Sequence, residues 1–136
     1  MSSKSAAAEL GGRVLVAREV AAGHEILCGL DRDPQYGPVL AVGLGGRAVE
    51  ALELAQVTLA PVGLAAAHAL VDDAPGLAPL LSTPARDDVA RTLVALGRLA
   101  RDHPDVAAVD VNPLIASADG AVAVDALVVV DRGGVA

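Results

Sequence analysis

One long amphipathic segment, residues 85–102, limits the folds open to this chain more than any other feature. Thr83 can cap a helix here, Pro84 suits its first position, and Asp87 and Asp88 favour the positive end of its dipole. His103-Pro104 ends it. Its apolar residues recur at helical spacing and give one face that must pack on a sheet: Val89, Leu93, Leu96 and Ala100.

Short apolar runs elsewhere supply the sheet. An Ala- and Leu-rich second helix is predicted over 63–71, and a helical turn over 5–10. The loop 31–37 is marked by Pro and Gly. We expect strands over 14–20, 25–30, 39–42, 48–52, 56–59, 106–111 and 121–130, the first two joined by a turn at Ala22-Gly23. Strands interrupted by two helices indicate an α+β or α/β sandwich with one sheet and one helical layer.

Length and charge exclude several function classes. The 136 residues predict a single domain, 1–136, whose core is aliphatic because Phe and Trp are absent and Tyr36 is the only aromatic residue. A net charge of −7 without a basic run argues against nucleic acid as a partner. The N-terminus lacks a signal-peptide core and no apolar run is long enough to span a membrane, so we expect a soluble, cytoplasmic protein. Cys28 stands alone, which predicts a buried structural thiol.

The last two strands carry the most informative polar residues. Asp110 and Asn112 share one face of their strand, and Asp125 interrupts an apolar run on the next. If Ser117–Gly120 forms the loop, Ala116 pairs with Ala121 and Asn112 lies opposite Asp125; a tighter turn shifts them by one pair. Two carboxylates and an amide suit Mg²⁺, and a buried Asp125 would need a cation, a hydrogen-bond donor or water. The alternative is that Asn112-Pro113 is only a turn and Asp125 accepts backbone hydrogen bonds or faces solvent.

The glycine loop Gly43-Leu44-Gly45-Gly46 follows a strand and could approach a phosphate. It is not a dinucleotide fingerprint, because Ala48 occupies the last glycine position. An ordinary turn explains the loop equally well. The histidines show no metal-ligand spacing: His68 and His103 are expected on helix surfaces and His24 at a strand start.

Taken in order, these segments resemble one family. The segments that carry the resemblance are Val14-Leu15-Val16, Gly23-His24-Glu25, the run from Arg32 to Pro38 (RDPQYGP), the glycine loop with Val49-Glu50, Leu59-Ala60-Pro61, the run from Asp110 to Ile115 (DVNPLI), and Val124-Asp125-Ala126. Over residues 12–131 the chain resembles the C-terminal ATP-grasp subdomain of ADP-forming acetyl-CoA (acyl-CoA) synthetases, relatives of the succinyl-CoA synthetase β subunit. This resemblance implies an α+β fold, the C-terminal half of an ATP-grasp fold, with a mostly antiparallel sheet and two helices packed on it.

The resemblance also implies roles for particular residues. Asp110, Asn112 and Asp125 match the positions that hold the Mg²⁺ of ATP or ADP. Glu25, Gly45, Gly46 and Glu50 match nucleotide-side positions. The family joins an acid to CoA with ATP, through an acyl phosphate and a phosphohistidine.

Two departures from the family bear on function. The N-terminal ATP-grasp subdomain, the CoA-binding domains and the phosphohistidine segment are absent from this sequence. An arginine of the family is replaced by Thr58, and an Arg-Gly pair by Ser82-Thr83. Because positioned cations stabilise a transferring phosphoryl group, their loss weakens phosphate binding.

Three functions therefore stand as hypotheses. The first is a partial ATP-grasp module that completes an acid–CoA ligase with N-terminal ATP-grasp and CoA-binding subunits, or by self-association, and is inactive alone. The second is a non-catalytic binding or assembly module that keeps the fold. The third is a stand-alone nucleotide-binding domain built on the glycine loop.

Overall fold

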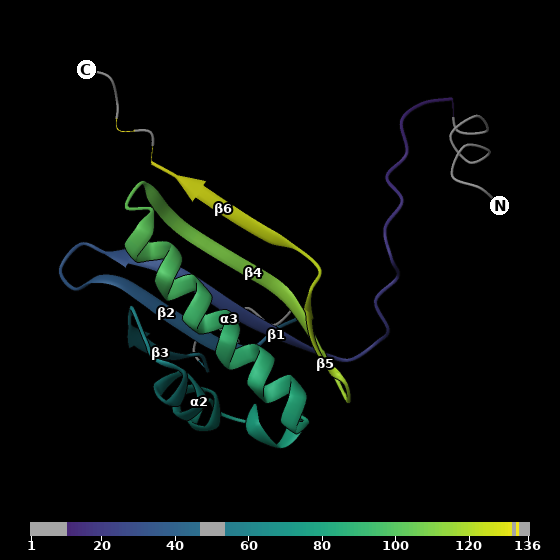
Figure 1. Ribbon diagram of the computed structural model, residues 1–136, viewed down its shortest axis with the longest axis horizontal. Helices are drawn as coiled ribbons and strands as arrows, with labels where there is room; N and C mark the ends of the chain where they lie inside the picture. Colours follow the sequence, from purple (N-terminus) through teal and green to yellow (C-terminus); the bar gives the residue numbers. More distant parts are fainter. Residues whose placement is uncertain (1–10, 47–53, 132, 134–136) are drawn as a thin grey trace.

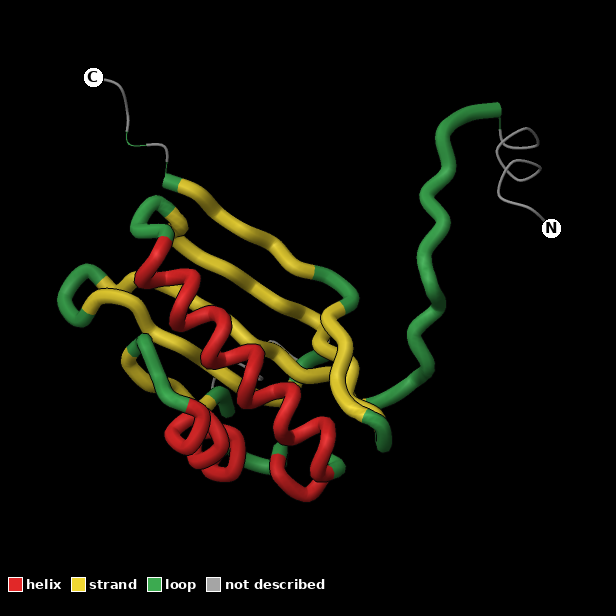
Figure 2. Tube along the Cα trace, viewed as in Figure 1, coloured by secondary structure: helices red, strands yellow, loops and turns green. Residues whose placement is uncertain are grey.

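The computed structural model describes residues 11–46, 54–131 and 133. Within them, one sheet carries a layer of two helices on one face (Figures 1 and 2). The strands are β1 (His24–Asp33), β2 (Gly37–Leu44), β3 (Gln56–Leu59), β4 (Val106–Ser117), β5 (Gly120–Ala123) and β6 (Ala126–Val130). The helices are α2 (Leu64–Asp73), α3 (Thr83–Asp102) and the short 3₁₀ helix η2 (Ala78–Leu80). The α+β class predicted from the sequence is confirmed.

The six-stranded sheet has the order β3-β2-β1-β4-β5. β6 is off this path: it pairs with residues 106–111 of β4, and β5 pairs with residues 114–117. All its pairings are antiparallel. The β4–β5 hairpin turns between Ser117 and Gly120, which places Ala116 opposite Ala121. The first of the two registers predicted from the loop is therefore correct.

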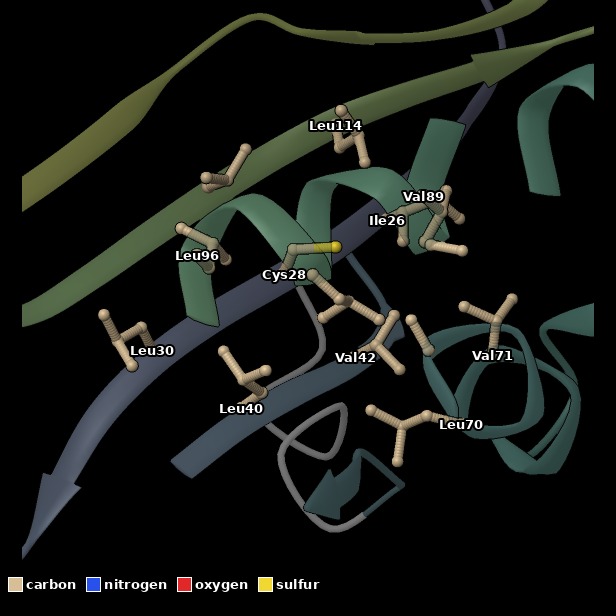
Figure 3. Close-up of a cluster of buried hydrophobic side chains, with 14 of the residues drawn as sticks. Ile26, Cys28, Leu30, Leu40, Val42, Leu70, Val71, Val89, Leu96 and Leu114 are labelled. Atoms are coloured by element: carbon tan, nitrogen blue, oxygen red, sulfur yellow. The ribbon is translucent and has the colours of Figure 1, made fainter. Parts of the chain in front are cut away.

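The core lies between the sheet and the helices and is aliphatic, as predicted. β1 contributes Ile26, Cys28 and Leu30 on alternating positions, and each is at most 2% exposed. Figure 3 shows these side chains meeting residues of β2, β4 and both helices. The helical partners include Val71, Val89 and Leu96. Because β1 has side-chain period two, its other residues face away from the helices.

The helices were predicted correctly, but α3 begins earlier than expected. Its cap is Ser82 rather than Thr83: the Ser82 Oγ accepts from the Ala85 N–H at 3.2 Å. The same hydroxyl donates to the Ser117 carbonyl oxygen at 2.8 Å. Further along α3, the Asp88 Oδ2 accepts from the Ala121 N–H at 2.9 Å. These bonds fix the start of α3 to the β4–β5 hairpin.

The predicted strand over 14–20 is wrong. Residues 13–23 form an extended arm that pairs with no described strand and projects from the body (Figure 1). Its apolar side chains are exposed, Leu15 to 93% and Val16 to 67%. No turn forms at Ala22-Gly23; the chain runs straight into β1. Strand propensity alone does not build a strand where no neighbouring strand is available.

Other boundaries moved outward. β1 ends at Asp33 and β2 begins at Gly37. The predicted loop 31–37 is therefore only a turn at 34–36. β3 has the predicted bounds. β4 continues past Val111 through Pro113 to Ser117, and the predicted strand 121–130 is two strands, interrupted at 124–125. The predictions for 5–10 and 48–52 lie outside the described residues.

Candidate nucleotide and magnesium site

The sheet face opposite the helices carries an open hollow of about 660 Å³. Its walls come from β1, β2, β3, β4 and β6. Most of the lining is apolar, and the polar side chains in it are Asp31, Asp110 and Asn112. The apolar lining that faces away from the helices includes Leu27, Val39, Ala41, Val57, Leu127 and Val129.

Gly45 and Gly46 close one end of the hollow and lie against Glu25. The Gly45 N–H donates to the Glu25 carbonyl oxygen at 2.8 Å. A Cβ at Gly45 would lie 3.2 Å from that same oxygen, so glycine permits the close approach. Gly46 has φ +109°, and a Cβ there would lie 3.4 Å from the Glu25 Oε2. Three of the residues predicted on the nucleotide side therefore come together, and Glu50 lies outside the described residues.

Asp110 and Asn112 lie two residues apart on β4 and line the hollow, whereas Asp125 lies between β5 and β6 and is not among the lining residues. The Asn112 N–H donates to the Asp125 carbonyl oxygen at 3.1 Å, which confirms that the two residues are opposite. Asn112 and Pro113 lie inside β4, so the alternative that they form only a turn is wrong. The peptide bond between them is cis.

These three side chains are exposed, which corrects one step of the sequence argument. Asp125 was predicted to be buried in an apolar run, where it would need a cation, a hydrogen-bond donor or water, with exposure to solvent as the alternative. That run, residues 122–130, is exposed throughout, and no charged residue is buried in the described core. Desolvation therefore does not force a cation onto Asp125.

The donor set still suits magnesium. Mg²⁺ takes one or two carboxylates, keeps several waters and shares nucleotide phosphates. Asp110 and Asn112 offer a carboxylate and an amide oxygen on the hollow, and Asp125 offers a second carboxylate outside its lining. A closed metal cage is not present in the described ranges, where no three acidic, His or Cys side chains gather.

Among the described residues, the hollow lacks the positive charge that phosphates need. Its described lining contains no Lys or Arg. Arg32, in the motif that carried the family resemblance, is used elsewhere: its Nε donates to the Val106 carbonyl oxygen at 2.7 Å. Its Nη2 donates to the carbonyl oxygens of Ala100 at 2.8 Å and His103 at 3.1 Å. Arg32 thus ties β1 to the end of α3 and the start of β4.

The rest of that motif is also structural. The Asp33 Oδ1 accepts from the N–H groups of Gln35 at 2.8 Å and Tyr36 at 2.9 Å. Gly37 has φ +83°, which glycine adopts without strain. The motif therefore builds the β1–β2 turn.

Sequence reasoning missed Asp31, which was assigned to a loop. It lies in β1 on the face that bears the hollow. The signal was available in the alternation of Glu25, Leu27, Gly29 and Asp31 with the buried residues of β1.

The other reactive residues are engaged away from the hollow. Cys28 is fully buried, and burial raises the pKa of its thiol to about 12. His68, predicted on a helix surface, instead bridges α2 and α3. Its Nε2 lies 3.1 Å from the Asp87 Oδ1, and its Nδ1 lies 3.0 Å from the Arg86 Nη1. His24 starts β1 as expected, and His103, expected on a helix surface, is the C-cap of α3; both are exposed.

Comparison with known proteins places this chain in one family. An ATP-grasp domain model matches residues 2–130, so the chain belongs to the ATP-grasp family. It is 34% identical over 124 residues to the acetate–CoA ligase (ADP-forming) I subunit beta of Pyrococcus furiosus. It is 35% identical over 117 residues to the acetate–CoA ligase (ADP-forming) I of Archaeoglobus fulgidus. These matches cover 88% and 82% of this chain but 53% and 17% of the relatives, so the chain spans about half of the first and a sixth of the second.

Solved structures agree. The dinucleotide-forming acetyl-coenzyme A synthetase 1 of Ca. Korarchaeum cryptofilum, in complex with coenzyme A and Mg-AMPPCP, matches with a TM-score of 0.75 at 29% identity. The match covers 82% of this chain and 55% of that one. PH1788 from Pyrococcus horikoshii matches with a TM-score of 0.73 at 27% identity. The fold is thus part of an ATP-grasp fold, as the sequence resemblance implied.

No helix among the described residues is long and apolar enough to cross a membrane.

Proposed function

We propose that this chain is the nucleotide- and magnesium-binding part of an ADP-forming acid–CoA ligase and that a partner chain supplies the rest. The observation that carries the proposal is the β4 register. It sets Asn112 opposite Asp125 and keeps Asp110 and Asn112 on the hollow that Gly45 and Gly46 close. A similar structure was solved with Mg-AMPPCP and coenzyme A, which supports the same ligand class here.

In this proposal, Asp110, Asn112 and Asp125 hold Mg²⁺, which neutralises phosphate charge when the nucleotide is bound. The backbone of Gly45 and Gly46, with Glu25 beside them, positions the nucleotide, and the apolar lining excludes water from it. Glu50 shares this role by the family resemblance alone. The cations that phosphoryl transfer requires come from the partner, because the described lining of the hollow has none. The partners that would supply these cations are N-terminal ATP-grasp and CoA-binding subunits. The chain alone is not expected to join an acid to CoA.

The direct test is calorimetric titration of the chain with Mg-ATP and Mg-ADP. We expect weak binding that EDTA abolishes and that the double variant Asn112→Ala, Asp125→Ala loses. Asp119→Ala is the matched control, since Asp119 is an exposed acid in the β4–β5 turn, away from the hollow. Absence of heat at millimolar nucleotide, or equal binding by the double variant, would contradict the proposal.

A binding or assembly module is the second candidate. The observation that favours it is the same absence of cations in the described hollow, together with Thr58 at the centre of β3 where the family resemblance implies an arginine. The titration separates the ligase part from the binding or assembly module. A module that does not bind nucleotide gives no metal-dependent heat, although it is folded.

A further inference from the structure

A second hollow, of about 650 Å³, lies in the helix layer, whereas the proposed nucleotide site lies on the opposite face of the sheet. It runs between the exposed side of α3 and residues 61–64, which lead from β3 into α2. Its charged side chains are all arginines, Arg91, Arg98 and Arg101. We propose that this arginine groove binds a segment of a partner protein in which two acidic residues flank apolar ones.

The groove has an apolar wall beside its arginines. Gly97 brings the two sides together, because a Cβ there would lie 3.2 Å from the Pro61 Cα and 3.4 Å from the Val62 nitrogen. The apolar side chains that line the groove are Pro61, Val62, Leu64, Val94 and Ala95. Leu64 is 36% exposed. Apolar contact area next to arginine is the mixture found in many protein interfaces.

The arginines are held in place by their own helix. The Arg91 Nε donates to the Asp87 Oδ2 at 2.6 Å, and the Arg101 Nε donates to the Asp102 Oδ1 at 2.7 Å. Arg98 forms no ion pair among the described residues. Even when the two paired acids are counted, the three arginines leave a net positive charge, in a chain whose overall charge is −7. Charge complementarity therefore favours an acidic occupant.

The spacing of the arginines suits an extended segment. An α-helix rises about 1.5 Å per residue, so Arg91 and Arg98 lie about 10 Å apart along α3. An extended chain rises about 3.3 Å per residue, so acids about three positions apart reach both arginines. The residues between those acids then lie over the apolar wall. Arginine also binds a carboxylate through a planar fork, which lysine lacks.

Other anions fit the groove less well. A free phosphate would contact the arginines but leave the apolar wall exposed to water. A nucleic acid would bring a row of phosphates over a chain with a net charge of −7. A short acidic segment with apolar residues between its acids uses both the charge and the wall.

The test is fluorescence anisotropy of the full chain with a labelled synthetic peptide in which two glutamates flank two leucines, in EDTA and without nucleotide. We expect binding that weakens as salt is raised. Arg98→Ala should weaken it about tenfold, and Arg98→Lys should recover only part of that loss. Leu64→Gln should weaken it about threefold, because apolar contact is lost. Arg18→Ala removes an exposed arginine outside the groove and is the matched control.

A second peptide, with glutamines in place of the glutamates, should not bind. Absence of binding by the first peptide at millimolar concentration, or equal binding of the two peptides, would overturn the proposal. So would equal affinity of Arg98→Ala or Leu64→Gln and the control, with circular dichroism showing that each variant is folded. Displacement of the peptide by an equal concentration of inorganic phosphate would assign the groove to small anions and would also overturn it. The groove shares no residue with the proposed nucleotide site, so failure here leaves the proposed function standing.

Discussion

At the scale of single residues, the motif that most resembled a functional signature proved to be structural. Arg32 donates three hydrogen bonds to main-chain carbonyl oxygens at the junction of β1, α3 and β4. Asp33 shapes the adjacent turn. Sequence position alone could not reveal these roles, because the carbonyl partners of Arg32 lie about 70 residues away.

We therefore expect Arg32→Ala to lower the free energy of unfolding by about 2 kcal/mol, because partly buried carbonyl groups lose a charged donor. Arg32→Lys should recover only part of this loss, since an ammonium group lacks the planar fork. Urea unfolding followed by circular dichroism measures both. Arg98→Ala, at an exposed position of α3, is the control and should change stability by less than about 0.5 kcal/mol. An Arg32→Ala protein as stable as that control would refute the assignment.

At the scale of elements, the sequence predicted those whose signal is local. The helical period of α3 and the alternation in β1 and β2 depend on neighbours in the chain, and all three were found. The loop at Ser117–Gly120 limited the register of β4 against β5 to two choices, and the structure has the first. The arm was mispredicted because its strand character requires a partner strand that the chain does not provide. The open hollow was not predicted, since it depends on which sheet face the helices leave uncovered.

The stability that the contact between α2 and α3 contributes should depend on pH. Arg86 holds the pKa of Asp72 below its ordinary value, mainly through a side-chain hydrogen bond. The pKa of Asp87 is lowered first by its hydrogen bond with Arg91 and also by His68. Carboxyl groups with lowered pKa stabilise the fold above their ordinary pKa, and this contribution disappears as pH falls below about 4.

Removing Arg86 should reduce this acid dependence. In Arg86→Met, the stability difference between pH 7 and pH 3 should be smaller than in the parent chain, because Asp72 loses its partner. Arg98→Met removes the same charge further along α3 and serves as the matched control. Urea unfolding at the two pH values decides the matter, and equal pH dependence in all three proteins would contradict the prediction.

At the scale of the whole molecule, the sheet has a covered face and an open face. The helices bury the aliphatic core on one side, and the other side presents the hollow with its apolar lining. An open, mostly apolar hollow with a few polar groups is the usual form of a small-molecule site. This asymmetry agrees with the coverage of the relatives, which are longer than this chain.

The open face should bind a hydrophobic dye in the native state. Leu127→Lys, within the hollow, should reduce native anilinonaphthalene sulfonate fluorescence while leaving the unfolding free energy within about 0.5 kcal/mol. Val122→Lys changes a similarly exposed residue of β5 outside the hollow lining and should leave the fluorescence unchanged. Equal losses in the two variants would show that the dye binds elsewhere.

The alternation of β1 has a consequence for how this protein tolerates change. Substitutions at Ile26, Cys28 and Leu30 act on the core, so they lower the yield of folded protein before any ligand is added. Substitutions at Leu27, Gly29 and Asp31 act on the open face, so they change ligand binding while the melting temperature stays the same. A mutational scan of this single strand, read once for abundance and once for binding, would therefore give two interleaved profiles with a period of two residues.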